Sequence, residues 1–464
     1  MRVLGRALLL LVVLALAGAG IGWFMAGREP GPSVRISSPE AFIGQATTLQ
    51  FTVEAPGGQL ASLEAALEQG GQTTTVATLA DAVTPAEGAD GAAPEGVSIS
   101  RPIGRRDVPT LANGPARIVI TAARPVFFGL RTATTSITHD VEVRLDPPRI
   151  AVLSLHHYVN LGGAEFVVLR ATPPDASAGV RVGDVEYPAY PGSAVGLADP
   201  ALRVAFFALR HDQDLNATIS AFARDAAGNQ VTTPVDHRSF DKRFVQSRIG
   251  IDQGFLDRVV PAIAAETPDL KIDTSTPESR LEGFLTINGN LRRANDAFIR
   301  SLATGSRPEM LWTEAFAQLG NTQVESRFAD RRTYFFGDRE IDRQVHLGFD
   351  LASVRQAPVL AANTGVVVFA DFLGIYGNCV ILDHGLGVQS LYAHLSTLGV
   401  KDGDRVEKGA ELGRTGITGL AGGDHLHFTM LVHGTPVNPV EWWDRKWMED
   451  RVFRKVREAG GDRF

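Results

Sequence analysis

A chain of 464 residues is too long for one hydrophobic core and is expected to fold as roughly three domains. Hydrophobic residues at 44% and charged residues at 21% are typical of globular proteins, which excludes a disordered or fibrous class. The net charge of -7 gives no basic surface of the kind that binds nucleic acid, so we expect no nucleic-acid partner.

The first 28 residues predict a membrane segment. Arg2 and Arg6 precede an apolar run at residues 7–27, which is long enough to span a bilayer. Because the arginines precede the run, the positive-inside rule places the rest of the chain outside the cytoplasm. A cleaved signal peptide is the alternative, since residues 15–17 form an A-x-A site. We therefore predict residues 1–28 as an anchor or signal segment, in a single-pass inner-membrane protein of the cell envelope whose bulk is periplasmic or extracytoplasmic.

Two β-rich domains are predicted next. Alternation of apolar and polar residues, as at 48–53 and 117–121, predicts a β-sandwich over residues 33–146. Two prolines end this block, and a second β-sandwich is predicted over residues 149–245. Within it, the segment 219–232 resembles the closing hairpin of bacterial immunoglobulin-like domains, and both sandwiches are expected to be immunoglobulin-like.

Residues 250–332 predict a helical connector, because the apolar period changes there from two to 3.6. One apolar stripe consists of Phe255, Leu256, Val259, Val260 and Ile263. Thr276 followed by Pro277 predicts a helix start. Ser306 with Glu309 forms a capping-box pattern, which predicts a further helix that ends at residues 320–321.

Residues 333–443 return to short apolar strands separated by glycines, which predicts a compact antiparallel sheet or partly closed barrel. Residues 444–464 predict a C-terminal helix whose apolar stripe, with Trp447 and Met448, docks on that sheet. The fold class expected for the whole chain is mainly β with a helical connector.

Histidines gather in this C-terminal region, which contains six of the eleven in the chain. His346 and Asp350 lie four residues apart, and both are good ligands for Zn²⁺. His425 and His427 lie at positions i and i+2, so in a strand both imidazoles reach the same site. His394, at the end of another predicted strand, supplies a further imidazole.

These motifs resemble the M23 family of zinc metallopeptidases, which contains LytM and lysostaphin. The resemblance runs from His346 to Trp443 and includes H-x-G-x-D at 346–350, Y-A-H-L-S at 392–396 and T-G…G-x-H-L-H-F at 418–428, in the order typical of the family. Two positions depart from the pattern: Asp424 replaces the usual proline, and Thr429 replaces the usual glutamate.

The resemblance implies a role for each of the five residues. His346, Asp350 and His427 would bind Zn²⁺, while His394 and His425 would stay unligated and act on water and substrate. Three protein ligands leave one coordination position open, which is the pattern of a catalytic zinc site.

Tyr376 and Asn378 match the family's Y-G-N segment and are candidates for the substrate groove, although a turn at the end of a strand explains them equally well.

The implied function is an exported zinc metalloendopeptidase that hydrolyses peptide bonds in peptidoglycan cross-links or stem peptides. This substrate class follows from the resemblance alone. The alternatives are a non-enzymatic LytM-type regulator of a cell-wall amidase, or a scaffold whose β domains bind the cell wall or a divisome protein. Lost zinc ligands would mark the regulator, and this sequence keeps all of them.

Overall fold

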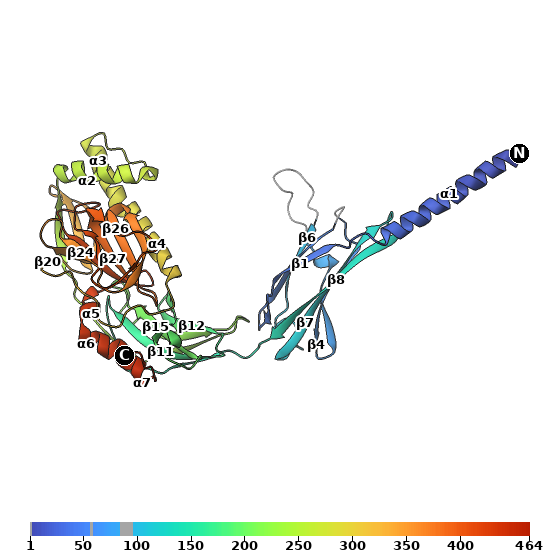
Figure 1. Ribbon diagram of the computed structural model, residues 1–464, viewed down its shortest axis with the longest axis horizontal. Coiled ribbons are helices and arrows are strands. Elements are labelled where there is room, and N and C mark those ends of the chain that lie inside the picture. Colours follow the sequence, from blue (N-terminus) through green and yellow to red (C-terminus); the bar gives the residue numbers. More distant parts are fainter. Residues whose placement is uncertain (1, 56–58, 84–95) are drawn as a thin grey trace. The chain divides into compact units, whose positions relative to one another are not determined.

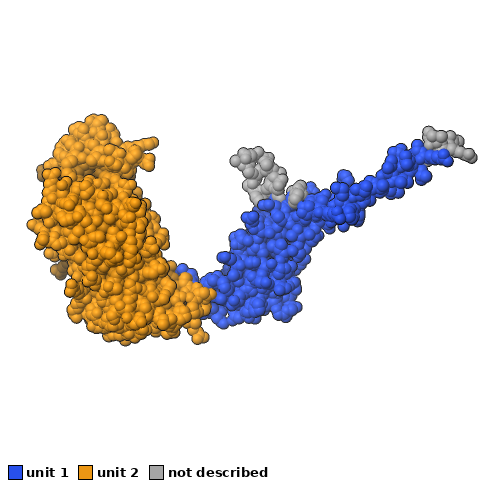
Figure 2. Space-filling model, in the orientation of Figure 1, with its two compact units in different colours: residues 1–148, 224–230 blue, residues 149–223, 231–464 orange. Residues whose placement is uncertain are grey.

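The computed structural model describes residues 2–55, 59–83 and 96–464, and the chain forms two compact units (Figures 1 and 2). The first unit contains residues 1–148 and 224–230, and the second contains residues 149–223 and 231–464. The helical connector and the strand-rich C-terminal region therefore share a unit with most of the second predicted β domain.

Helix α1 (Arg2–Ala26) carries the predicted membrane segment. Its stretch Arg6–Ala26 has a mean hydropathy of 2.4, and apart from Ala26 at its end its side chains are not buried in the protein. By length and composition this helix can cross a membrane, and a signal sequence has the same properties.

The rest of the first unit consists of two sheets that share one core. The first sheet has the order β1-β3-β6, with β1 (Ser33–Ser38), β3 (Thr48–Glu54) and β6 (Gly96–Pro102). The second has the order β2-β8-β7-β4-β5, with β2 (Phe42–Ile43), β4 (Ser62–Gln69), β5 (Gln72–Thr78), β7 (Gly114–Val126) and β8 (Arg131–Val143). A short 3-10 helix, η1 (Leu79–Asp81), follows β5. Along β3 every second side chain is buried, so Phe51 and Val53 pack in the same core as Leu67 of β4.

The second unit begins with three small sheets. One has the order β14-β15-β11-β9, with β9 (Arg149–Val152), β11 (Ala164–Thr172), β14 (Tyr190–Pro191) and β15 (Leu202–Ala208). Another has the order β13-β12-β16-β17, with β12 (Ser177–Val182), β13 (Val185–Pro188), β16 (Ile219–Arg224) and β17 (Gln230–Pro234). The third pairs β10 (His157–Asn160) with β18 (His237–Phe240), and η2 (Gly192–Val195) follows β14. The prediction of β structure is confirmed, and the immunoglobulin-like assignment stays a prediction.

The helical connector is confirmed and has capped helices. Its elements are α2 (Gln253–Glu266), η3 (Pro268–Leu270), α3 (Pro277–Thr286), η4 (Ile287–Leu291), α4 (Arg292–Leu302) and η5 (Ala303–Gly305). The side chain of Asp252 accepts a hydrogen bond from the Phe255 N–H, and that of Thr276 accepts one from the Ser279 N–H. The predicted helix start at Thr276 is therefore correct. The predicted stripe packs inward, with Leu256, Val259, Val260 and Ile263 all buried.

The predicted helix between residues 306 and 320 is wrong, because this segment is an extended connection. The Ser306 hydroxyl donates to Asp383 at 2.6 Å and accepts from the Gly387 N–H at 2.8 Å, so it is not available to cap a helix. Trp312 and Phe316 are buried in the core instead. Tertiary contacts decide the conformation here, against the local capping pattern.

The C-terminal region is a layered β domain. Three strands run in the order β19 (Gln246–Ile251), β21 (Asp330–Phe336) and β22 (Arg339–His346). The main sheet has the order β20-β23-β31-β27-β26-β25-β29, with β32 (Thr435–Val437) paired to β31 (Leu426–Val432). Its other strands are β20 (Gln323–Ser326), β23 (Phe349–Ala352), β25 (Gly365–Phe372), β26 (Asn378–Asp383), β27 (Val388–Leu395) and β29 (Arg405–Val406). A smaller sheet contains β24 (Pro358–Leu360), β28 (Thr397–Leu398) and β30 (Glu411–Arg414), and η6 (Gly374–Tyr376) precedes β26.

The C-terminal helical segment packs on the second β domain as well as on the sheet. It consists of α5 (Pro439–Trp443), α6 (Arg445–Met448), η7 (Glu449–Phe453) and α7 (Arg454–Glu458). Met448 and Val456 are fully buried in a core that continues into strands β11 and β15. The Lys455 ammonium donates to the Glu165 carboxylate of β11 at 2.8 Å. The second β domain and the peptidase domain therefore share one core.

Candidate metal centre and its cleft

Three buried side chains converge at one point of the main sheet. His346 is the last residue of β22, while Asp350 on β23 lies directly opposite His427 on β31 in the antiparallel register. His346 Nε2 lies 2.9 Å from Asp350 Oδ1 and 2.9 Å from His427 Nδ1, and His427 Nδ1 lies 3.0 Å from Asp350 Oδ1. Among the described residues these three form a group with the spacing needed to hold a metal ion.

Hydrogen bonds on the far side of each ring determine where the ring hydrogens lie. His346 Nδ1 lies 3.2 Å from the Arg327 carbonyl, which can only accept, so this nitrogen carries the hydrogen. The Thr429 hydroxyl donates to the Leu347 carbonyl at 3.0 Å and therefore accepts from His427 Nε2 at 3.0 Å. Both rings consequently direct a lone pair towards the point of convergence.

The donor set fits a zinc ion. Two imidazole lone pairs and a carboxylate oxygen meet without a hydrogen between them, and only a cation can satisfy all three. Zinc prefers four-coordinate sites of nitrogen and oxygen ligands, and three protein ligands leave one position open. The residues predicted to bind Zn²⁺ are therefore brought together with the chemistry that this ion requires.

The electrostatic environment favours an ionised Asp350 and a neutral His427. Burial alone would raise the pKa of the Asp350 carboxyl, but the surrounding His346, His425 and His427 hold this pKa well below its usual range. Burial lowers the pKa of His427 to about 4, so its ring is neutral at neutral pH. An ionised carboxylate beside neutral imidazoles is the form that binds a metal.

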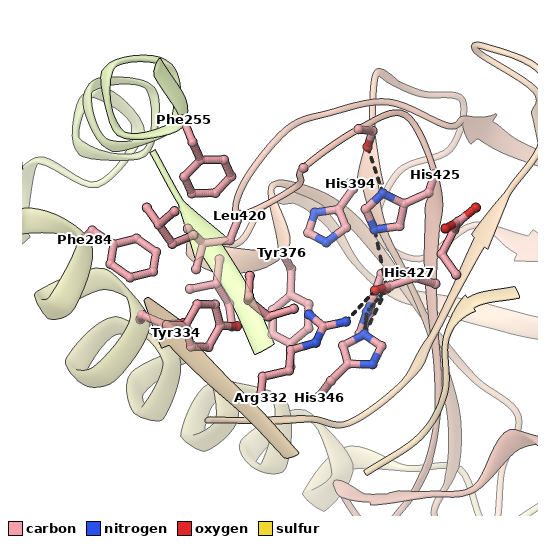
Figure 3. A pocket seen from close by; sticks show the side chains of 18 of the residues that line it. Phe255, Phe284, Arg332, Tyr334, His346, Tyr376, His394, Leu420, His425 and His427 are labelled. Atoms are coloured by element: carbon pink, nitrogen blue, oxygen red, sulfur yellow. Dashed lines mark hydrogen bonds and ion pairs between the residues drawn. The ribbon is translucent and has the colours of Figure 1, made fainter. Parts of the chain in front are cut away.

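The two remaining histidines flank this cluster without joining it (Figure 3). His394 Nδ1 lies 2.8 Å from the Thr418 carbonyl, and its ring centroid lies 4.9 Å from that of His425. His425 Nδ1 lies 2.8 Å from the Gly423 carbonyl, while its Nε2 is 3.4 Å from Asp350 Oδ1. Since each carbonyl accepts the Nδ1 hydrogen, each neutral ring keeps an acceptor at Nε2.

An arginine that sequence analysis missed contacts the metal cluster. Arg332 on β21 donates from Nη2 to Asp350 Oδ2 at 2.8 Å, which leaves Oδ1 facing the two histidines. Position 332 lies ahead of the motif and has no spacing that relates it to the ligands, so only the pairing of β21 with β22 could have identified it.

A cleft of about 550 Å³ opens in front of the five residues. One wall carries the histidines, and the facing wall is apolar and comes from the helical connector and β21, with Phe255, Phe284 and Tyr334 (Figure 3). Leu420 and Tyr376 also line the cleft. The cleft therefore lies between polar groups and an aromatic surface.

The two predicted groove residues have different surroundings. The Tyr376 ring lies 5.6 Å from the His427 ring, measured between centroids, and lines the cleft. Asn378 donates from its side chain to the Leu395 carbonyl at 3.1 Å, and its backbone N–H donates to Thr418 Oγ1 at 3.0 Å. Asn378 thus links the end of β27 to the loop at Thr418, and a role in substrate binding stays a prediction for both residues.

Comparisons with known proteins place the same region in a family. Residues 344–439 match the model of peptidase family M23, so the C-terminal region contains an M23 peptidase domain. The chain is 42% identical over 97 residues to the DD-carboxypeptidase/endopeptidase Mpg of Neisseria meningitidis, which covers 21% of this chain and 22% of the relative. It is 35% identical over 119 residues to the peptidoglycan DD-endopeptidase ShyA of Vibrio cholerae, which covers 26% of this chain and 27% of the relative. The chain thus spans about a quarter of the length of the curated relatives that it matches.

Solved structures are matched over different lengths. The catalytic domain of lysostaphin from Staphylococcus simulans is 28% identical, with a TM-score of 0.25 over 28% of this chain and 98% of that domain. A zinc-containing peptidase from Vibrio cholerae is 11% identical, with a TM-score of 0.25 over 89% of this chain and 85% of that chain.

Proposed function

We propose that this chain, which carries an M23 peptidase domain in its C-terminal region, is an exported zinc metalloendopeptidase that hydrolyses peptide bonds in peptidoglycan cross-links or stem peptides. The observation that carries the proposal is the convergence of two imidazole lone pairs and one carboxylate oxygen at the floor of an open cleft. Of the matched relatives, one is named a DD-carboxypeptidase/endopeptidase and another a peptidoglycan DD-endopeptidase, which supports the substrate class.

His346, Asp350 and His427 would hold the zinc ion. When bound, this ion supplies Lewis-acid chemistry, lowering the pKa of a water molecule and polarising a carbonyl group. Arg332 keeps the Asp350 carboxylate oriented by its bond to Oδ2.

His394 and His425 would carry out proton transfer. Each Nδ1 donates to a backbone carbonyl, which fixes the ring and leaves Nε2 as the atom that exchanges a proton with water or substrate. One of the two would accept the proton of the attacking water, and the other, in its protonated form, would donate a hydrogen bond to the developing oxyanion. The separation of 4.9 Å between their ring centroids leaves both within reach of one scissile bond.

Digestion of purified sacculi tests the proposal. We expect the full chain with zinc to release muropeptides whose masses, read by mass spectrometry, identify the cleaved bond. A His346→Ala variant should release none, and sacculi left intact by the zinc-loaded protein would refute the peptidase function. The amidase-regulator alternative has less support, because the group of three ligands is intact.

The proposed location follows from the N-terminal helix. We place α1 across the inner membrane, with both β domains and the peptidase domain on the periplasmic side where peptidoglycan lies. The β domains at residues 33–146 and 149–245 would set the distance between membrane and wall or bind a wall or divisome protein. Membrane fractionation and N-terminal sequencing test the anchor, and a soluble protein beginning at Gly18 would contradict it.

A further inference from the structure

The turn between β7 and β8 exposes large apolar side chains at one end of the first unit. Residues 127–130 join the two strands, and within this turn Phe128 is 98% exposed and Leu130 is 70% exposed. Scattered exposed hydrophobic residues are common, but two in one tight turn form a patch that water solvates poorly.

The backbone of this turn is unfavourable for the residues it contains. Phe127 and Phe128 have φ angles of 51° and 56°, in the left-handed region that bulky side chains rarely adopt. Asparagine and glycine are the residues that favour such angles in hairpin turns. Folding alone therefore does not explain two phenylalanines here, and strained positions of this kind often have a function.

The turn is packed against the last turns of α1. The Phe127 and Trp23 rings lie edge to face, with 5.9 Å between their centroids. Gly22 permits this approach, since a Cβ atom there would lie 2.7 Å from Cε2 of Phe127. Arg131 Nη1 donates to the Trp23 carbonyl at 2.7 Å, and the Ala26 side chain is buried in the same small cluster. These contacts hold the turn level with the end of the apolar helix (Figure 1).

The side chains around the turn match the composition of a membrane interface. Trp23 lies three residues before Ala26, which is about 4 to 5 Å along a helix axis, so the turn is level with the last part of the apolar span. The Arg28 guanidinium lies 4.4 Å from the Phe24 ring centroid, and that of Arg131 lies 5.2 Å from the nearest ring centroid of Trp23. Trp rings are enriched where a protein meets lipid headgroups, and arginine side chains at such a place keep their charged heads among the headgroups.

We propose that the β7–β8 turn inserts Phe128 and Leu130 into the bilayer interface beside α1, so that the first β domain contacts the membrane through a second element. The proposal rests on α1 being the anchor proposed above. The occupant of the apolar patch is the lipid bilayer, because the patch continues directly from the exposed apolar face of α1. The turn would thereby fix the orientation of this domain on the membrane.

Site-specific probes in the full chain test the insertion. Cys379 is the only cysteine and is fully buried, so Phe128→Cys or Leu130→Cys can be labelled with an environment-sensitive fluorophore. The protein is reconstituted in vesicles of phosphatidylethanolamine and phosphatidylglycerol. Nitroxide-labelled lipids then report contact with the bilayer, and aqueous iodide reports exposure to water. We expect the nitroxide lipids to quench both probes several-fold more strongly than iodide does.

Two further probes make the outcomes distinct. Gln72→Cys lies at the first residue of β5, beside the β4–β5 turn at the opposite end of the sheet, where Glu68 pairs with Arg117, and should be quenched by iodide only. Leu14→Cys lies within α1 and should be quenched by the lipids only.

If position 14 is quenched by lipid but positions 128 and 130 behave like position 72, the turn does not insert and the inference is overturned. Protection of 128 and 130 from both quenchers would mean a protein partner or a second copy, which also overturns it. If position 14 itself is quenched by iodide, the anchor fails and the insertion with it, whereas sacculus digestion tests the peptidase function independently.

Discussion

His425 and His427 are two residues apart on one face of a strand, yet their ring nitrogens have different surroundings. His427 Nδ1 belongs to the convergent cluster, whereas His425 Nε2 lies 3.4 Å from Asp350 Oδ1. This geometry supports the separation into a ligand and a proton-transfer residue that the family resemblance implied.

If His427 is a ligand and His425 a proton-transfer residue, replacing them should have different effects on zinc content and turnover. His427→Ala should lose both zinc and activity, because a ligand contributes directly to metal binding. His425→Ala should keep most of its zinc and lose about 10² to 10⁴ in turnover, the usual effect of removing a positioned acid or base. Metal analysis beside muropeptide release measures both quantities. A metal-free His425→Ala protein, or a loaded His427→Ala protein, would reverse the assignment.

Thr429 replaces the glutamate usual in the family, and its hydroxyl accepts the hydrogen bond that orients His427. Thr429→Val preserves the shape but removes this acceptor, so we expect zinc affinity to fall by about 10- to 100-fold. Competition with a chromophoric chelator measures the change. Thr429→Ser, which retains the hydroxyl, is the control and should bind zinc as the parent does. If the Thr429→Val variant bound zinc as tightly as the parent, the Thr429 hydroxyl would not contribute to zinc binding.

At the scale of elements, helix α2 is more than a connector, because it supplies part of the apolar wall of the cleft. Phe255 is half-buried and faces the histidines across this space (Figure 3). We expect Phe255→Ala to raise KM about tenfold while zinc content stays unchanged, since one lost aromatic contact weakens substrate binding by about 1 to 2 kcal/mol.

The matched control is Phe298→Ala on α4. Phe298 is 38% exposed and packs on Phe369, and it is not among the residues that line the cleft. Its replacement should leave KM on defined muropeptides unchanged. An effect of similar size in both variants would mean that Phe255 acts through stability and not through the substrate.

Local sequence patterns predicted most elements and pointed to the five histidine and aspartate residues that line the cleft. Alternation marked strands such as β3, and the capping residue Thr276 marked the start of α3. The helix predicted after Ser306 was wrong because the Ser306 hydroxyl donates a hydrogen bond to Asp383, a partner 77 positions away. Arg332 was missed for the same reason, since its relation to Asp350 exists only after β21 and β22 pair. Contacts between distant segments leave no periodic signal in the sequence.

At the scale of the whole molecule, the second β domain and the peptidase domain are joined by buried polar contacts. Glu441, at the start of the C-terminal helical segment, accepts from the Asn160 side chain at 2.7 Å and from the Ala164 N–H at 2.8 Å. The Lys455 ammonium and the Glu165 carboxylate form a buried ion pair at the same junction. The predicted second β domain ends at residue 245, because strand and helix periods do not reveal that two segments share one core.

The buried carboxyl at this junction makes the stability of the second unit depend on pH. Burial raises the pKa of Glu441 from 4.5 to about 7. A carboxyl with a raised pKa binds its proton more tightly in the folded state, so its contribution to stability is complete below about pH 4.5 and is lost as the pH rises to about 7. The loss should be about 3 kcal/mol. His157 has the opposite effect on the pH dependence of stability. Burial lowers its pKa from 6.5 to about 4, so its contribution to stability increases as the pH rises from about 4 to 6.5.

A variant is needed to separate these opposing effects, and Glu441→Gln removes the titrating group while keeping its size. We expect the parent to lose stability relative to this variant between pH 4.5 and 7, so that the difference between their free energies of unfolding narrows by about 3 kcal/mol across that window. The glutamine places an N–H₂ group against the N–H donors of Asn160 and Ala164, so the variant should be less stable at every pH, and only the slope reports on titration. Denaturant unfolding of the full chain, followed at several pH values, measures the slope. If the free energies of unfolding of parent and variant change in parallel with pH, Glu441 stays ionised at the junction. Lys242 or another nearby cation would then compensate its charge.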